Sequence, residues 1–184
     1  MRSTIALCLA ALPLGAFAQA PDDILTGDVR LACEAILCLS SGQAPSECQP
    51  SLKRYFSIVR RTTSRTLQAR RDFLKLCPTA NENDYMRNLV ESLVDGSGRC
   101  DAAALNGGGW SGGEGNYSVS NKMPANCVAY YANTGVDLQA PKYVGTPERG
   151  GHWVEASAYD AELAAYNERI RKEDEARANA SSGS

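Results

Sequence analysis

Residues 28–41 read DVRLACEAILCLSS, and this stretch decides how the chain begins to fold. Its apolar side chains recur at the spacing of one face of an α-helix. The positions on this face are Val29, Ala32, Cys33, Ile36 and Leu37. Gly42 follows where a helix commonly ends. The pattern therefore predicts a helix over residues 28–41, and Cys33 and Cys38 give it two thiols for attachment to other parts of the chain.

Upstream of this helix, the N-terminal segment has the three parts of a secretory signal peptide. Arg2 supplies a positive charge, residues 5–14 are mostly apolar, and residues 16–18 read AFA, a small-x-small cleavage site. We predict that residues 1–18 are the signal peptide, that cleavage follows Ala18, and that the mature protein is periplasmic. No other apolar stretch is long enough to cross a membrane, so we expect no transmembrane segment after signal removal.

Export would place the cysteines in an oxidising compartment, where they are expected to form disulfides. Cys8 would leave with the signal peptide, and an even number would remain in a compartment where disulfides form. The remaining ones are Cys33, Cys38, Cys48, Cys77, Cys100 and Cys127. No Cys-x-x-Cys motif is present and His152 is the single histidine, so we expect neither a metal site nor a cofactor. Three structural disulfides are the expected outcome.

Residues 50–77 predict a second helical region. Pro50 stands where a helix can begin, and Pro78 stops the run. Residues 61–64 read RTTS, which has weak helix propensity and is the expected break. Six cysteines allow fifteen pairings, and the sequence leaves them open. A geometric guess, which needs this region to fold back on itself, gives the pairs Cys38–Cys48, Cys33–Cys77 and Cys100–Cys127.

The second helical region is also the most basic part of the chain. Asp72 is the only acid among eight cations, which are Lys53, Arg54, Arg60, Arg61, Arg65, Arg70, Arg71 and Lys75. Arg54, Arg61 and Arg65 fall on one face of a continuous helix, and we predict a partner-binding surface there. The alternative is a solvated face whose charge is balanced by acidic residues elsewhere.

A glycine-rich segment follows at residues 96–115, which hold eight of the 16 glycines. This composition predicts a loop without helix or strand. Trp110 and Tyr117 lie in or just beyond it, and we predict that they form a second partner-binding tip. The alternative is a surface loop with no partner.

Two more helices are expected. One covers residues 84–96, with Asn83 or Asp84 as its N-cap. The other is C-terminal and has an apolar stripe at Tyr159, Leu163, Tyr166 and Ile170. Residues 128–155 predict irregular structure with at most short strands near 128–131, and residues 178–184 predict a disordered tail.

Composition sets the broad class. The chain has 184 residues, of which 43% are hydrophobic and 22% are charged, so one globular domain is expected over residues 19–177. The formal charge of −2 disfavours direct binding to nucleic acid. We predict a mainly α fold, a small disulfide-stapled helical domain with a glycine-rich loop and an irregular C-terminal half.

Residues 24–78 carry a family resemblance. The segments that carry the resemblance are ILTGD at 24–28, CEAILCLSSG at 33–42, EC at 47–48, PSL at 50–52, YFSI at 55–58 and RDFLKLCP at 71–78. Together they resemble the TrbM family of plasmid conjugal-transfer proteins. The resemblance implies an exported accessory protein of the mating-pair-formation apparatus, a type IV secretion relative. It also implies a structural role for the family's four cysteines, at Cys33, Cys38, Cys48 and Cys77.

We expect no enzyme, because no Gly-x-Ser-x-Gly or Cys-plus-His nucleophile signature is present and the family offers no catalytic motif. We interpret residues 149–153, which include His152, as a turn with Trp153 packed on the domain. The favoured function is to assist assembly or stability of the mating channel. Expected partners are mating-channel proteins or a cell-wall lytic transglycosylase. Alternatives are a peptidoglycan-acting enzyme or adaptor of such a transglycosylase, and a small secreted toxin or inhibitor.

Overall fold

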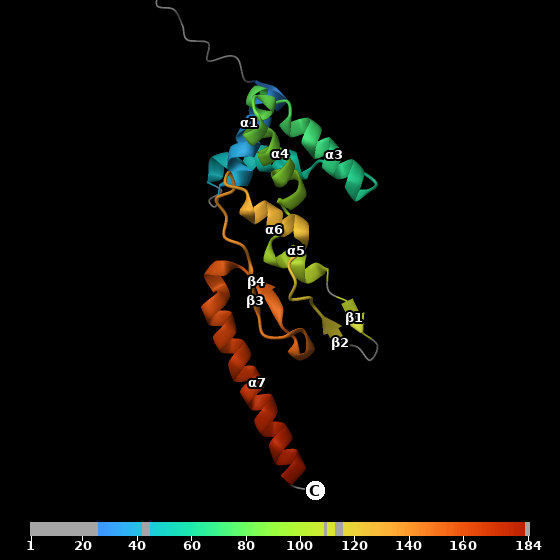
Figure 1. Ribbon diagram of the computed structural model, residues 1–184, viewed down its shortest axis with the longest axis vertical. Helices are drawn as coiled ribbons and strands as arrows, with labels where there is room; N and C mark the ends of the chain where they lie inside the picture. The colour runs from blue at the N-terminus through green and yellow to red at the C-terminus, as the bar shows by residue number, and fades with distance from the viewer. Residues whose placement is uncertain (1–25, 42–44, 109, 113–115, 183–184) are drawn as a thin grey trace, which may run out of the picture.

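A computed structural model describes residues 26–41, 45–108, 110–112 and 116–182 (Figure 1). The predicted signal peptide, its cleavage after Ala18, and Cys8 lie outside these residues. Within them the chain is mainly α-helical, as the sequence predicts. None of the helices in the described part combines the length and the apolar composition that a membrane crossing needs.

The N-terminal bundle consists of α1 (Gly27–Ser40), α2 (Gln49–Phe56), α3 (Thr63–Leu74) and α4 (Asp84–Gly96). A short 3-10 turn at Ser46–Cys48 leads into α2, and another at Pro78–Asn81 leads toward α4. α1 packs against the other three helices. Its buried face differs slightly from the predicted stripe, because Leu39 is buried whereas Leu37 is 70% exposed.

The second helical region breaks and folds back. Helix α2 ends at Phe56, and α3 starts at Thr63, so the break begins before the predicted residues 61–64. The Thr62 hydroxyl caps α3 by accepting a hydrogen bond from the backbone N–H of Arg65, at 3.3 Å. This fold-back returns the chain to α1, where Cys33 pairs with Cys77.

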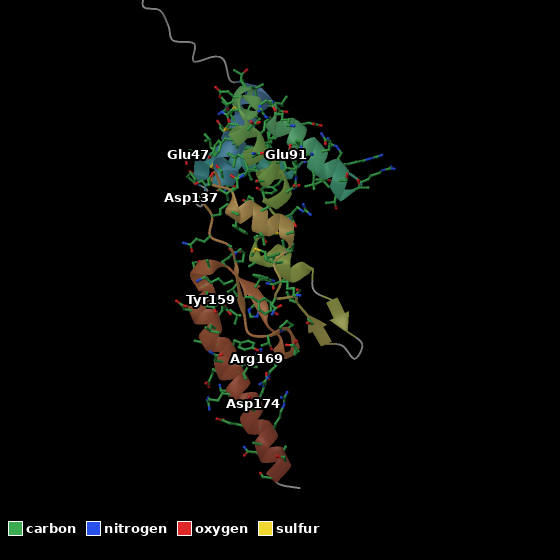
Figure 2. The ribbon with its side chains drawn as sticks, in the orientation of Figure 1. Glu47, Glu91, Asp137, Tyr159, Arg169 and Asp174 are labelled. Atoms are coloured by element: carbon green, nitrogen blue, oxygen red, sulfur yellow. A yellow bond between two sulfur atoms is a disulfide. The ribbon has the colours of Figure 1, made fainter. Side chains whose placement is uncertain are left out.

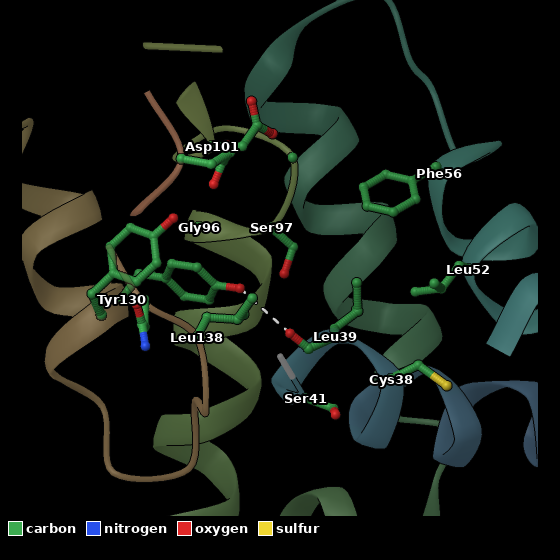
Figure 3. A pocket seen from close by; sticks show the side chains of 14 residues that line it. Cys38, Leu39, Ser41, Leu52, Phe56, Gly96, Ser97, Asp101, Tyr130 and Leu138 are labelled. Carbon is green, nitrogen blue, oxygen red and sulfur yellow. Dashed lines mark hydrogen bonds between the residues drawn. The ribbon is translucent and has the colours of Figure 1, made fainter. Parts of the chain in front are cut away.

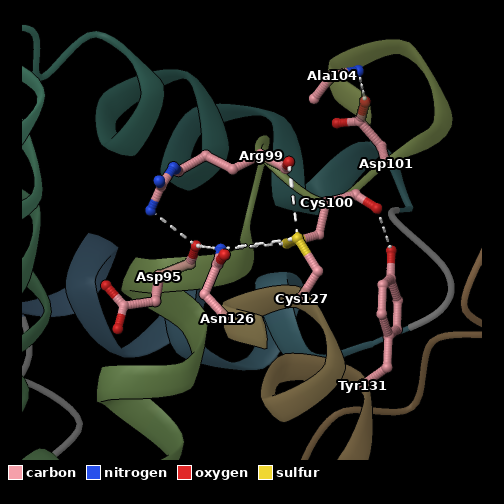
Figure 4. The surroundings of a disulfide bond; sticks show 8 residues. All are labelled: Asp95, Arg99, Cys100, Asp101, Ala104, Asn126, Cys127 and Tyr131. Atoms are coloured by element: carbon pink, nitrogen blue, oxygen red, sulfur yellow. Dashed lines mark hydrogen bonds between the residues drawn. A yellow bond between two sulfur atoms is a disulfide. The ribbon is translucent and has the colours of Figure 1, made fainter. Parts of the chain in front are cut away.

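All three pairs of the geometric guess are present. The second joins Cys38 to Cys48 across the first connection. The third joins Cys100 to Cys127 and bridges the glycine-rich segment (Figure 4). Beside this bridge, the Tyr131 hydroxyl donates to the carbonyl oxygen of Cys100 at 2.9 Å. The Asn126 side chain donates to the carbonyl oxygen of Asp95 at 3.2 Å, so the bridge sits in a hydrogen-bonded junction.

The prediction of a loop without helix or strand is wrong for the described part of residues 96–115. Helix α5 (Ala102–Gly107) forms there, capped by the Asp101 carboxylate, which accepts from the backbone N–H of Ala104 at 2.7 Å. Three alanines and a leucine begin this helix, and such strong helix formers outweigh the glycines beyond them. Strands β1 (Trp110–Gly112) and β2 (Asn116–Ser118) then pair antiparallel.

The expected irregularity of residues 128–155 is also corrected. Helix α6 (Ala125–Ala132) includes the residues predicted as possible strands, because Cys127 and Tyr130, three positions apart, bury one helical face. Strands β3 (Lys142–Val144) and β4 (His152–Val154) form an antiparallel hairpin. Between them lies a 3-10 turn, Pro147–Arg149. Gly150 closes this turn at φ +70°, a conformation that favours glycine.

Helix α7 (Tyr159–Ser182) follows another 3-10 turn, Ala156–Ala158, and projects away from the rest of the molecule (Figure 1). Its predicted stripe is confirmed. The half-buried and buried side chains Tyr159, Leu163, Tyr166 and Ile170 pack with Val144 and Val154 in a small second core. The helix continues to Ser182, so the predicted disordered tail is wrong for residues 178–182.

The main core joins both halves of the chain. It runs from α1 through α4 and α6 to Trp153 on β4. Across this core, the Tyr130 hydroxyl donates to the carbonyl oxygen of Leu39 at 3.4 Å. The Trp153 indole N–H donates to the carbonyl oxygen of Ser120 at 2.9 Å. The C-terminal hairpin is therefore held against the bundle by buried side chains as well as by the backbone.

Candidate interaction surface

The α2–α3 elbow, residues 49–74, carries all three of the predicted partner-binding cations. Figure 1 shows that the N-terminal end of α3 points away from the bundle, so the connection at residues 57–62 stands at its edge. The bend overturns one step of the sequence argument. Arg54 lies on α2, Arg61 lies in the connection and Arg65 lies on α3, so the three do not share a face of one continuous helix.

Arg54 is a structural crosslink. Its guanidinium donates to both carboxylate oxygens of Asp28 on α1, at 3.0 and 2.6 Å, and lies 5.0 Å from the ring centre of Phe73 on α3. The hydrogen bonds from Arg54 lower the pKa of Asp28 below its usual value, and Asp28 in turn raises the pKa of Arg54. One side chain thus links three helices. Arg54 would have to give up these contacts to bind a partner, so it is a poor candidate for a partner-binding residue.

The cations near the C-terminal end of α3 also form contacts within the protein. Arg71 donates to Glu91 on α4 at 2.6 Å, and Lys75 lies 3.7 Å from the same carboxylate, which Figure 2 labels between the two helices. Arg70 lies over the rings of Tyr55 and Phe56, at 5.0 and 5.4 Å from their centres. These residues hold α3 on the bundle through charge pairing and cation–π contacts.

The tip of the elbow, residues 60–65, carries cations that are exposed to solvent. Arg60, Arg61 and Arg65 are exposed, and none of them forms an ion pair with another residue in the described part of the chain. Their backbone is nevertheless well held. The Thr66 hydroxyl accepts from the backbone N–H of Arg60 at 2.9 Å, and Thr62 caps α3 at Arg65. The tip therefore presents fixed positive charge on an ordered backbone.

An apolar groove lies beside these cations. We call it the elbow groove; its cavity is about 240 Å³. Its lining residues are Arg54, Ile58, Arg60, Ala69, Asp72, Phe73 and Leu76. Leu76 is 44% exposed, and the neighbouring Val59 is 66% exposed. Such a surface is suited to a partner that offers an apolar side chain next to acidic groups.

The sequence argument missed this groove. Its walls come from α2, the connection and α3, and they meet only because the chain folds back. Arg60 was recognised only as one of eight cations, and nothing in the local sequence distinguishes it from Arg54, which is paired. The one available signal was the weak helix propensity of residues 61–64, which correctly predicts a bend.

The other predicted tip lies elsewhere. Trp110 and Tyr117 stand on β1 and β2, where Trp110 is opposite Ser118 and Tyr117 is opposite Ser111. The side chains of Trp110 and Tyr117 lie outside the described part of the structure. Figure 1 places the β1–β2 hairpin apart from the elbow, so the two predicted surfaces are separate.

His152 lines a cavity of about 360 Å³ together with Glu162, Tyr166 and Arg169. It lies on β4 with its Nε2 3.9 Å from a Glu162 carboxylate oxygen, and the side chains of His152 and Glu162 are 40% and 48% exposed. Trp153 is buried as expected, although it stands in a strand and not in a turn. Among the described residues, no three histidine, cysteine or acidic side chains gather in a way that could hold a metal ion.

Comparison with known proteins gives one family. A model of the TrbM family matches residues 24–167, which is well over half of the chain. No curated protein and no solved structure matches the sequence or the fold. The match extends far beyond residues 24–78, on which the sequence resemblance rests, and includes the elbow, the three disulfides and the first part of α7.

Proposed function

Because this chain belongs to the TrbM family, a plasmid conjugal-transfer family, we propose that it is an exported periplasmic accessory protein of conjugation. In this proposal it assists assembly or stability of the type IV secretion-like mating channel by binding other proteins, without a catalytic role. Three disulfides support the extracytoplasmic location, because such bonds persist in oxidising compartments.

The elbow carries the proposal. Arg60, Arg61 and Arg65 are exposed and unpaired within the described residues, while the other elbow cations that pair or stack hold the bundle together. A free cluster next to the elbow groove fits an acidic protein surface with an apolar anchor. The partners that we favour are mating-channel proteins or a cell-wall lytic transglycosylase.

Charge reversal at the tip tests this function. The double variant Arg61→Glu, Arg65→Glu changes two side chains that no described residue pairs with, so the folded protein should accumulate normally. We expect plasmid transfer frequency to fall by at least about tenfold, the effect of a loss of about 1.4 kcal/mol in binding. Crosslinking in the envelope should recover a channel protein or transglycosylase with the native protein and lose it with the variant.

The matched control is Lys122→Glu, Arg177→Glu. It makes the same change in net charge at two exposed residues outside the elbow. Transfer at the native frequency by this control and a loss by the elbow variant would support docking through the elbow. Native transfer by both variants, at normal protein levels, would overturn it.

A further inference from the structure

A second cavity lies where the bundle meets the C-terminal half. This central pocket measures about 270 Å³ and lies between the C-terminal ends of α1 and α4, α2, α6 and the chain that follows α6 (Figure 3). It is separate from the elbow groove, with which it shares no lining residue. Nothing in the proposed function uses it.

A buried hydroxyl points into the central pocket. Ser97, just after α4, is 5% exposed, and its side chain points into the pocket in Figure 3. It lies close enough to Tyr130 to oppose the rise that burial causes in the pKa of that tyrosine. Yet its oxygen has no hydrogen bond of good geometry among the described residues. A buried hydroxyl in this state is stabilised by a ligand that supplies the missing hydrogen bond.

One side of the pocket is acidic. The Asp101 carboxylate accepts from Ala104 at 2.7 Å, and the Glu155 carboxylate accepts from the backbone N–H of Ala102 at 2.9 Å. Neither forms an ion pair with a cation of the described chain. Burial raises the pKa of Tyr131 and both carboxylates raise it further, which places the two negative charges near one ring. Among the described residues, no Lys or Arg lines the pocket.

The opposite side is apolar. Figure 3 shows Leu52 and Phe56 on a side of the pocket away from Asp101, with Ser97 and Leu39 between them. Phe56 is 40% exposed, although it is a large aromatic side chain. From Asp101 toward Phe56, the pocket therefore presents negative charge, the Ser97 hydroxyl and an apolar surface, in that order.

We propose that the central pocket binds a partner peptide in which a lysine is followed by an apolar residue. The ammonium group faces Asp101 and Glu155, an amide of the peptide backbone reaches the Ser97 hydroxyl, and the apolar side chain packs on Leu52 and Phe56. An ammonium beside the ring of Tyr131 also gains a cation–π contact. Free diaminopimelate fits less well, because each of its ammonium groups has a carboxylate beside it that the two acidic side chains would repel.

Titration with short blocked peptides tests the proposal on the full, disulfide-bonded protein. Acetyl-Lys-Leu-amide should shift the backbone amide resonances of Ser97, Gly98 and Tyr131 in a saturable way. Acetyl-norleucine-Leu-amide, which lacks the ammonium group of lysine, should bind at least about tenfold more weakly, because a hydrogen bond to a charged group is worth about that factor. Diaminopimelate should also bind at least about tenfold more weakly, because its carboxylates face the two acidic side chains. Equal binding of the uncharged peptide, or no saturable shift with the lysine peptide, would overturn the proposal.

Isosteric variants locate the binding. Asp101→Asn keeps a good N-cap for α5, and Glu155→Gln keeps an acceptor for Ala102, so both remove charge without removing the hydrogen bonds to the backbone. Each should weaken the lysine peptide by about fivefold to tenfold. Ser97→Ala should weaken it by about threefold without lowering the melting temperature, since that hydroxyl makes no good bond in the free protein.

Glu82→Gln is the charge-matched control, because Glu82 is exposed and outside the pocket. It should bind the lysine peptide as the native protein does. Variants at Asp101, Glu155 and Ser97 that all bind with native affinity would place the peptide elsewhere and overturn the assignment. Plasmid transfer is not the readout, so failure of this proposal leaves the elbow proposal intact.

Discussion

The N-terminal bundle and the distal part of α7 are both helical, but different interactions stabilise them. In the bundle, each helix buries apolar side chains, and Leu93 and Val90 are fully inaccessible to solvent. Beyond Ile170, α7 buries no side chain. Ion pairs along its own surface, such as Arg171 with Glu168, cover it, and Arg149 between β3 and β4 pairs with Glu173 and Asp174. Apolar packing holds one helical region, whereas charge pairing, within the helix and with Arg149, holds the other.

The largest loss of stability should follow from removing the disulfide that spans the most residues in the bundle. Replacing Cys33 and Cys77 together by serine opens a link between residues 44 positions apart. We expect unfolding in denaturant to require about 4 kcal/mol less, because the unfolded chain regains the entropy of that loop. The Cys38–Cys48 disulfide closes a shorter loop, so replacing both of its cysteines by serine should lower the free energy of unfolding by about 3 kcal/mol. Equal stability of the native protein and the first variant would contradict this account.

Truncation of apolar side chains should destabilise the packed helices more than the projecting helix. Leu93→Ala removes a fully buried side chain from α4 and should lower the free energy of unfolding by about 3 kcal/mol. Leu163→Ala removes a half-buried side chain near the start of α7 and should cost about 1 kcal/mol. Chemical denaturation of both variants measures the difference. A larger loss from Leu163→Ala would show that α7 is part of the main cooperative unit.

Substitution of the N-cap of α4 measures how much local hydrogen bonding contributes to the stability of the bundle. The Asn83 side chain accepts from the backbone N–H of Met86 at 2.9 Å and so caps α4. Asn83→Ala should destabilise the protein by about 1 kcal/mol, and Asn83→Asp should be nearly neutral because aspartate caps equally well. Thermal unfolding of the pair separates capping from side-chain size. Equal losses from both substitutions would show that the cap contributes little.

Acid should melt the distal part of α7 before the bundle. Hydrogen bonds from Arg171 and Lys172 lower the pKa of Glu168 to about 2. Since this pKa is lower in the folded helix than in the unfolded chain, the stabilisation is complete above about pH 4.3 and is lost as the pH falls toward 2. Amide exchange of residues 171–182 should speed up between pH 5 and pH 2.5 by more than the intrinsic change, while that of residues 89–94 stays protected.

Glu168→Gln provides the control for that experiment. The variant lacks the titrating group, so its distal helix should exchange faster at pH 5 and should respond less to acid than the native helix does. Unchanged protection of residues 171–182 at pH 2.5 in the native protein would mean that packing, and not charge pairing, holds this part of α7.

The successes and failures of sequence reasoning follow the range of the interactions involved. The helices at α1, α3 and α4 were predictable because their apolar spacing and their breaks are local. Helices α5 and α6 were missed because glycine content and aromatic residues suggested other structures, while Asp101 and the Cys127–Tyr130 face favoured helix. The predicted cluster of Arg54, Arg61 and Arg65 failed because its geometry assumed an unbroken helix.

The family, the mainly helical class and the six cysteines between residues 33 and 127 were all evident from the amino-acid sequence. These depend on residue identity and on neighbours within a few positions, which a single chain displays directly. Tertiary structure decided which cysteines pair, that Arg54 is tied to Asp28 while Arg61 stays free, and that Ser97 faces a pocket. Each of these depends on residues brought together by the fold-back of α2 on α3 and by the packing of α6 on α4, which no local pattern contains.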